Sequence, residues 1–244
     1  LARSTDIAAR VEFAAKAREI DGVRDWWSHD LEATEIDRLR AVQPWPGRSH
    51  EFDGREPPPR FARVLELACT AERRVVVYPE FKEPRRFLAN GLDPVEQVAA
   101  VLDTHDLAGD TAPVWLQCFD HAVLRRARQR CGNRCFALAE TLPHARDARS
   151  KQIQELAQWA DGIAPAKKLL WNAAGIDNGL VADAHSAGLE VHAWTFREDT
   201  SPAPFASPRA EFEAAFELGV DALFCDFPAV ALAVRSAYAE RWTG

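Results

Sequence analysis

The chain has 244 residues, a length typical of one large α/β domain or barrel. Hydrophobic residues make up 47% and charged residues 27%, a balance that excludes an intrinsically disordered chain. The formal net charge is -7, and lysines and arginines are spread among the acids, which argues against a nucleic-acid-binding surface. No apolar run approaches the roughly 18 residues that a membrane span needs.

Apolar residues with helical spacing occur twice in the first 60 residues, around Val11 and around Leu31. A Pro-rich stretch at about 43–59 follows and ends in three consecutive prolines. Proline lacks a backbone N–H and fixes φ, so this stretch cannot form a helix or a central strand. Long loops of this kind in compact domains often have a function.

From residue 61 onward, helical patterns alternate with short apolar runs that have the character of strands. Asp93-Pro94 and Ser207-Pro208 mark helix starts, because an N-cap residue precedes a proline there. The six predicted strands lie at residues 75–78, 114–116, 135–139, 162–163, 189–196 and 222–225. Each is followed by a predicted helix, so the pattern indicates six βα units.

Nearly continuous apolar strands are typical of parallel sheets that are buried on both faces. Two architectures fit, a doubly wound open sheet and a TIM (β/α)8 barrel. No glycine-rich phosphate motif follows any strand, which disfavours nucleotide binding. The chain contains no methionine and begins at Leu1 without a signal-peptide pattern. We therefore expect an α/β chain, a TIM barrel lacking its first two strands, as a single domain over residues 1–244.

The polar residues at the C-terminal ends of the strands are the candidate site, because barrels carry their chemistry there. Glu80 and Lys82 follow the first predicted strand and share a face if that strand continues. A carboxylate and an ammonium in this place suit a metal ion and a phosphate oxygen, respectively. Gln117 ends the second strand, and Trp194 lies near the end of the fifth.

Each candidate also has a purely structural interpretation. Glu80 and Lys82 form an ordinary ion pair in that interpretation. Gln117 then satisfies backbone groups, and Trp194 belongs to the core.

Other residues suit structural roles more directly. Asp120 and Asp226 are placed as helix N-caps. The five cysteines and seven histidines show no zinc or catalytic spacing. We expect buried thiols, with a disulfide between Cys131 and Cys135 as the alternative in an exported protein.

Four segments then occur in an order that is similar to one known family. They are Tyr-Pro-Glu-Phe-Lys at 78–82, Leu-Gln-Cys-Phe-Asp at 116–120, Asp-Ala-His-Ser-Ala-Gly-Leu-Glu-Val-His-Ala-Trp-Thr-Phe-Arg at 183–197, and Gly-Val-Asp-Ala-Leu-Phe-Cys-Asp-Phe-Pro at 219–228. The series resembles the glycerophosphodiester phosphodiesterases, particularly their longer periplasmic type, over the whole chain. Residues 1–6 resemble the segment after the family's His-Asp motif, and the Pro-rich stretch resembles that subfamily's insertion.

The resemblance implies a TIM barrel that hydrolyses glycerophosphodiesters to glycerol 3-phosphate and an alcohol, using a divalent metal, Ca2+ or Mg2+. Carried over by motif, Glu80 matches a metal-ligand carboxylate and Lys82 a residue close to the phosphate. Gln117 and Trp194 match residues that line the substrate pocket. The family's two catalytic histidines and two further metal carboxylates fall before residue 1, so we expect no catalytic residue in this chain and slow turnover by it.

The expected partner is a small-molecule glycerophosphodiester, with no nucleic acid and no transmembrane segment. The resemblance also implies a periplasmic or secreted location, with the cytoplasm as the alternative. Two other functions stay open. One is a non-catalytic barrel that only binds phosphodiesters. The other is a different TIM-barrel hydrolase, such as a glycosidase with Glu80 and Glu140 as paired carboxylates.

Overall fold

The computed structural model describes residues 1–200 and 203–242. The chain divides into two compact units. One comprises Leu1–Val75 and Arg85–Pro94, and the other comprises Val76–Pro84 and Val95–Gly244. Each unit is considered by itself, and the single domain over the whole chain stays a prediction.

The first unit is built from short elements around a small apolar core. Ile7, Phe13 and Leu39 are buried at its centre. Its elements are η1 (Asp6–Ala9), η2 (Val11–Lys16), β1 (Arg18–Ile20), β2 (Val23–Asp25), η3 (Ser28–Asp30), α1 (Ala33–Ile36), α2 (Phe61–Cys69) and α3 (Pro84–Ala89). The helical spacing around Val11 thus produces a 3-10 helix, and the Pro-rich stretch contains neither helix nor strand.

The antiparallel pair β1–β2 was not predicted from the sequence. Its turn consists of Asp21 and Gly22, whose φ angles are 53° and 77°. Asp-Gly is the preferred dipeptide for a two-residue hairpin turn, because both positions need positive φ. The signal was present, but the flanking strands are only three residues long and lack an alternating apolar pattern.

The second unit is organised around a parallel sheet with the strand order β3-β4-β5-β6-β7. The strands are β3 (Leu116–Cys118), β4 (Cys135–Ala139), β5 (Gly162–Pro165), β6 (Glu190–Phe196) and β7 (Ala222–Cys225). Each pairs with the next along the chain. A doubly wound sheet would reverse its order at a switch point, so this order excludes it for the described strands.

A sixth extended segment, residues 77–81, continues the sheet beyond β3. Parallel bridges join Val77 to Val114 and Glu80 to Gln117. Four backbone hydrogen bonds of 2.9–3.1 Å run between this segment and residues 113–117. All six predicted strands therefore lie side by side in parallel. The first is shifted by two or three residues from its predicted position, and the second, predicted at 114–116, by two.

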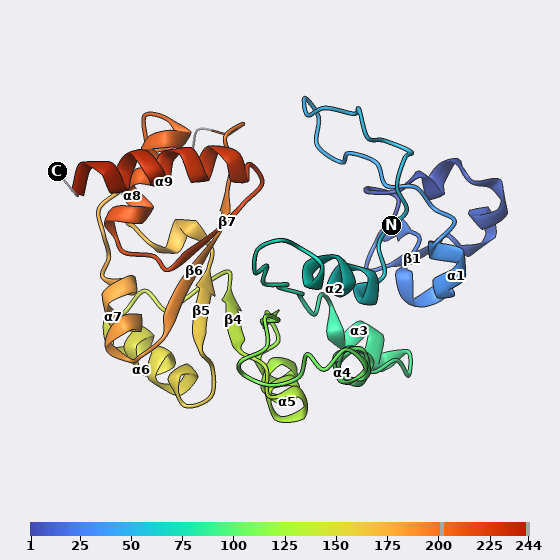
Figure 1. Ribbon diagram of the computed structural model, residues 1–244, viewed down its shortest axis with the longest axis horizontal. Helices are drawn as coiled ribbons and strands as arrows, with labels where there is room; N and C mark the ends of the chain where they lie inside the picture. The colour runs from blue at the N-terminus through green and yellow to red at the C-terminus, as the bar shows by residue number, and fades with distance from the viewer. Residues whose placement is uncertain (201–202, 243–244) are drawn as a thin grey trace. The chain divides into compact units, whose positions relative to one another are not determined.

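Helices follow the strands, and all but the last connect one strand to the next. They are α4 (Pro94–Thr104), α5 (His121–Cys131), α6 (Arg146–Ala157), α7 (Leu180–Ser186), α8 (Pro208–Glu217) and α9 (Pro228–Trp242), with the 3-10 turn η4 (Lys167–Leu169). Figure 1 shows α6 and α7 beside one face of the strands β5 and β6. Asp120 caps α5 as predicted, because its side chain accepts hydrogen bonds from the N–H groups of Ala122 and Val123. No helix in the described part of the chain is long and apolar enough to cross a membrane.

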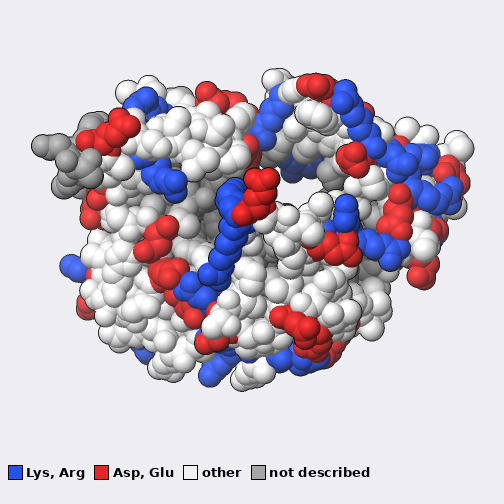
Figure 2. Space-filling model, in the orientation of Figure 1, with Lys and Arg blue, Asp and Glu red and all other residues white. Residues whose placement is uncertain are grey.

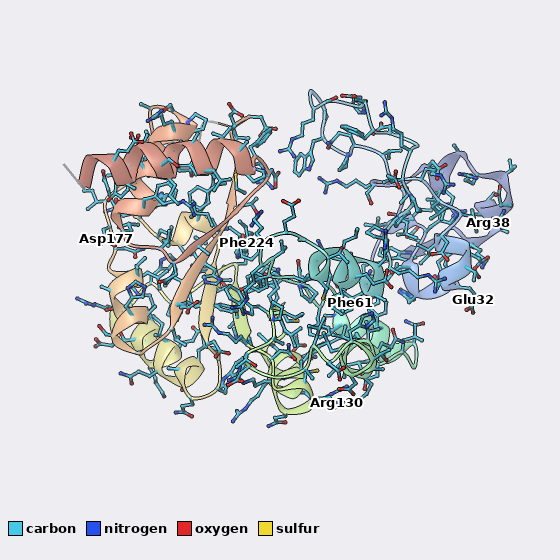
Figure 3. The ribbon with its side chains drawn as sticks, viewed as in Figure 1. Glu32, Arg38, Phe61, Arg130, Asp177 and Phe224 are labelled. Atoms are coloured by element: carbon cyan, nitrogen blue, oxygen red, sulfur yellow. The ribbon has the colours of Figure 1, made fainter. Side chains whose placement is uncertain are left out.

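The inner face of the curled sheet is covered by aromatic and small apolar residues. Buried Phe136, Leu138 and Ala164 are packed by four partly buried rings. Those rings are Tyr78, Trp115, Trp194 and Phe224, the last labelled on β7 in Figure 3. This layer fills the inside of the half-barrel and supports the residues above it at the strand ends.

Candidate functional site

Glu80 lies on the extended segment 77–81, directly beside Gln117 of β3. Tyr78, two residues earlier, packs into the inner face of the sheet, so Glu80 shares that face. Lys82 follows one residue beyond the ladder. Both Glu80 and Lys82 are exposed. Neither makes an ion pair or a side-chain hydrogen bond with any residue that the structure describes, so the ordinary ion pair between them is not formed.

Gln117 is 7% exposed, and its amide nitrogen donates a 3.2 Å hydrogen bond to the carbonyl of Tyr78 on the neighbouring segment. This contact supports the structural interpretation, in which the side chain satisfies a backbone group. The amide oxygen has no hydrogen-bond partner in the described part of the chain and is not fully buried. Gln117 therefore combines a fixed orientation with an accessible acceptor.

Trp194 is held from the neighbouring strand. Its indole N–H donates a 2.7 Å hydrogen bond to the carbonyl of Ala164 on β5. The regular β5–β6 pairing covers only two residue pairs, and beyond them only an isolated bridge joins Ala166 to Trp194. On the other side, an irregularity in the β6–β7 register falls between Ala193 and Phe196. Such bulges redirect side chains and are frequent next to active sites.

Phe119 completes an aromatic corner that the sequence interpretation missed. Its ring meets that of Trp194 edge to face, with centroids 5.6 Å apart, and the side chain is 48% exposed. Phe119 follows Gln117 by two residues and so continues the same face beyond β3. Its position two residues after a predicted site residue was the signal that could have identified it.

The predicted site residues are thus all placed at one edge of one parallel sheet. Glu80 and Gln117 are cross-strand neighbours, and Gln117 is linked through Phe119 to Trp194. Lys82 lies at the same end of its strand and makes no hydrogen bond or ion pair with the other three within the described residues. On the face drawn in Figure 2, acidic and basic side chains are interspersed.

Two ion pairs occupy other strand ends. Glu140, after β4, pairs with Lys168 of η4, and Arg197, after β6, donates a 2.8 Å hydrogen bond to Asp226 after β7. Glu140 is therefore bound to a lysine, whereas a carboxylate acting as acid or base in a glycosidase must face the substrate. Asp226 is engaged by Arg197 in addition to its position before α9.

The cysteine at the end of β3 is not a nucleophile. Burial raises the pKa of the Cys118 thiol to about 11, with smaller contributions from the Asp120 and Glu80 carboxylates. A thiol with this pKa is protonated at neutral pH and unreactive. Burial also raises the pKa of Cys135 to about 12, and its thiol and that of Cys131 are both free. The Cys131–Cys135 disulfide is not formed in this structure.

The described residues do not form a complete binding site for a divalent cation. Glu80 offers one free carboxylate, but no group of three or more His, Cys, Asp or Glu side chains within residues 1–200 and 203–242 is placed to hold a metal. A hard cation such as Ca2+ takes about 6–8 oxygen ligands. Among the described residues, Glu80 therefore supplies at most one of these ligands.

Comparison with known proteins identifies the family. The model of the glycerophosphoryl diester phosphodiesterase family matches residues 1–230. A glycerophosphodiester phosphodiesterase of Arabidopsis thaliana is 25% identical over 92% of this chain and 69% of its own length. One from Haemophilus influenzae is 25% identical over 68% of this chain, and the match spans about half, 54%, of that protein.

Solved structures support the fold. A candidate glycerophosphoryl diester phosphodiesterase from Silicibacter pomeroyi matches with a TM-score of 0.67 at 18% identity, covering 90% of this chain and 74% of that one. Another candidate, from Galdieria sulphuraria, matches with a TM-score of 0.64 at 16% identity, covering 91% and 77%. The predicted TIM-barrel fold is confirmed, and the chain belongs to the glycerophosphoryl diester phosphodiesterase family.

Proposed function

We propose that this chain acts in the hydrolysis of glycerophosphodiesters to glycerol 3-phosphate and an alcohol, a step of glycerophospholipid breakdown. The observation that carries the proposal is the gathering of Glu80, Gln117 and Trp194 at the C-terminal edge of one parallel sheet, in a chain of this family. Barrel enzymes assemble their sites at this edge.

The proposed roles follow from the chemistry of each group. The Lys82 ammonium is exposed and has no described partner, so it is available to a phosphate oxygen. The Gln117 amide oxygen can accept a hydrogen bond from a glycerol hydroxyl. Trp194 and Phe119 offer an apolar corner to the carbon atoms of the glycerol.

Glu80 is proposed as one oxygen ligand of a divalent cation, Ca2+ or Mg2+. Such a cation would polarise the phosphoryl group and offset the charge that grows in the transition state. In the reaction, water oxygen bonds to phosphorus and loses one proton, the bond from phosphorus to the alcohol oxygen breaks, and that oxygen takes up a proton. None of these five site residues is proposed to transfer this proton, so their role is to bind and orient.

Binding of a glycerophosphodiester tests the proposal most directly. Titration calorimetry of the chain with glycerophosphoethanolamine should detect binding, and Lys82→Ala should weaken it about tenfold, since a charge-assisted hydrogen bond contributes about 1.5–3 kcal/mol and exposure reduces it. Lys151→Ala, which removes an exposed lysine from α6, is the matched control and should bind like the unmodified chain. Equal affinity of all three proteins would exclude the phosphate role of Lys82.

Measurements with added calcium test the metal-ligand role of Glu80, and an activity assay separates an enzyme from a barrel that only binds. The glycerophosphodiester should bind more tightly with Ca2+ present, and Glu80→Gln should abolish that gain while preserving the shape of the side chain. Release of glycerol 3-phosphate, measured by a coupled assay, separates an enzyme from a barrel that only binds. Calcium-independent binding in both proteins would remove Glu80 from the proposed metal ligands.

A further inference from the structure

A hydrogen-bonded group lies inside the half-barrel, below the candidate site. The Tyr78 hydroxyl is 3.2 Å from Nδ1 of His192, and Nε2 of His192 is 3.2 Å from a carboxylate oxygen of Glu190. The second oxygen of Glu190 accepts a 2.8 Å hydrogen bond from Arg134. His192 is 1% exposed and stacks on Phe136 with ring centroids 4.1 Å apart.

The chemistry of the partners fixes the direction of these hydrogen bonds. The Glu190 carboxylate, bound to the Arg134 guanidinium, only accepts, so Nε2 of His192 must donate to it. The neutral imidazole then has its lone pair on Nδ1, and the Tyr78 hydroxyl donates to that atom. Burial lowers the pKa of His192, which keeps the ring neutral near pH 7.

The Tyr78–His192 contact joins two strands that are four positions apart in the sheet. In the strand order, the segment 77–81 is separated from β6 by β3, β4 and β5. Four steps of about 4.8 Å would place the two strands about 19 Å apart in a flat sheet. Their side chains meet at 3.2 Å because the sheet curls, so this hydrogen bond crosses the inside of the curve.

The two ends of this hydrogen bond lie directly below the candidate site. Tyr78 precedes Glu80 by two residues, and His192 precedes Trp194 by two residues. A spacing of two places each pair on one face of its strand. The hydrogen bond therefore connects the strand that carries Glu80 and Lys82 to the strand that carries Trp194.

We propose that the Tyr78–His192 hydrogen bond is a cross-brace that sets the separation between Glu80 and Lys82 on one side of the site and Trp194 on the other. Tyr78 and His192 are thus positioning residues, and they do not touch the substrate. The ligand used in the test rests on the proposed function, whereas the brace itself does not. A change in curvature of the sheet would move the two sides of the site apart while each strand stays intact.

The test combines ligand binding with a ligand-independent signal. Tyr78→Phe removes one oxygen and keeps the ring, and His192→Phe keeps the ring that stacks on Phe136. Each should weaken binding of glycerophosphoethanolamine about tenfold, and the double variant should be no weaker than the poorer single one, because both remove the same hydrogen bond. Ile153→Val, at a buried position of α6, is the control for a modest loss of stability of about 0.5–1.5 kcal/mol without loss of affinity.

Fluorine NMR of the chain labelled with 5-fluorotryptophan reports on the brace without a ligand. The Trp194 resonance, identified by its loss in Trp194→Phe, should shift in Tyr78→Phe and stay unchanged in Ile153→Val. Unchanged affinity together with an unchanged resonance in Tyr78→Phe would overturn the brace, even if that variant is less stable. If the unmodified chain binds no glycerophosphodiester, the proposed function fails, and the resonance alone then decides for or against the brace.

Discussion

At some positions inside the half-barrel, the size of the side chain decides which residue is tolerated, and Gly162 is one of them. Gly162 of β5 faces the Phe136 ring, and a Cβ atom built on it would lie 2.5 Å from that ring and 2.6 Å from the carbonyl of Glu190. Real Cβ atoms do not approach so closely, so the Phe136 ring, on which His192 stacks, occupies the volume that a side chain at 162 would need. The glycine is required by the ring and by the backbone carbonyl beside it, and no positive φ is involved.

We expect Gly162→Ala to lower the free energy of unfolding by about 1–3 kcal/mol, the usual cost of overpacking a core. Urea denaturation measures it. Phe136→Leu combined with Gly162→Ala should cost less than the sum of the two single changes, because the smaller side chain vacates the space. Strict additivity would show that the ring does not cause the loss.

The buried side chain of Asn133 holds three backbone segments together by hydrogen bonds. It is fully buried, and its amide nitrogen donates to the carbonyls of Leu107 and Val114 at 2.9 and 3.1 Å, while its oxygen accepts from the N–H of Gly109 at 3.3 Å. The side chain thereby joins the loop after α4 to the start of β3 and the turn before β4.

Asn133→Ala should destabilise the chain by about 2–6 kcal/mol, since it removes the side-chain donor to the carbonyls of Leu107 and Val114, and each buried group left without a partner costs about 1–3 kcal/mol. The N–H of Gly109 keeps its hydrogen bond to the carbonyl of Cys131. Thermal unfolding gives the size of the effect. Asn90→Ala, at an exposed position with one backbone contact, is the control and should change the midpoint little. A loss at Asn133 no greater than that at Asn90 would contradict the importance of the three hydrogen bonds.

Among the elements, the contact between η4 and α8 is held by a buried ion pair. Lys167 lies 2.7 Å from Glu211, which is 1% exposed, and the ammonium also lies over the Phe196 ring at 5.2 Å. Burial raises the pKa of Glu211, and the lysine opposes that rise. The pair joins the end of β5 to the helix that follows β6.

Removing one partner of the Lys167–Glu211 ion pair should lower the free energy of unfolding more than removing both. Lys167→Met leaves a buried carboxylate unpaired and should lower the free energy of unfolding by about 3–5 kcal/mol, whereas Lys167→Met with Glu211→Leu should recover much of it. A double-mutant cycle in urea measures the coupling. A double variant as unstable as Lys167→Met would mean that packing, and not the charge pair, holds the two elements together.

For the whole molecule, acid should weaken the fold through His192. The groups that face this imidazole are Glu190, Tyr78, Arg134 and Asp221. Burial lowers the pKa of His192 in the folded state, with the Glu190 carboxylate opposing that change. The unfolded chain therefore binds the proton more readily, so the stabilising contribution is complete above about pH 6.5 and is lost as the pH falls toward the folded-state pKa.

The unmodified chain should accordingly lose more stability between pH 7.5 and about pH 5.5 than His192→Gln does. The comparison with His192→Gln removes the contributions of other groups, including the opposite one from Glu211. Urea unfolding at a series of pH values supplies both curves. Parallel curves would show that His192 does not titrate between the folded and unfolded states.

Much of this architecture could be predicted from the sequence, because buried parallel strands appear as short apolar runs that alternate with helical patterns. Residues 135–139 and 222–225 match β4 and β7 at both ends. The site residues followed from their places at strand ends, and their roles stay predictions. Phe119 was missed because it lies one residue beyond β3, although its position two residues after Gln117 places it on the same face.

The Tyr78–His192 contact was beyond sequence reasoning for another reason. These two residues are 114 positions apart. Strands that are apolar on both faces do not reveal which face turns inward, so the spacing of His192 and Trp194 could not show that both face the inside of the barrel.

The sequential strand order has a consequence for how the second unit folds. Each paired strand meets its neighbour in the chain, so the sheet can grow by closing one moderate loop at a time. Contacts across the curve, such as the Tyr78–His192 hydrogen bond and the ring pair of Tyr78 and Phe224 on β7, instead require distant strands of the sheet to meet. The middle strands β4 and β5 gain partners on both sides, while residues 77–81 and β7 each have one described neighbour. Amide hydrogens in the middle strands should therefore exchange with solvent most slowly, and the protection should decline toward both edges.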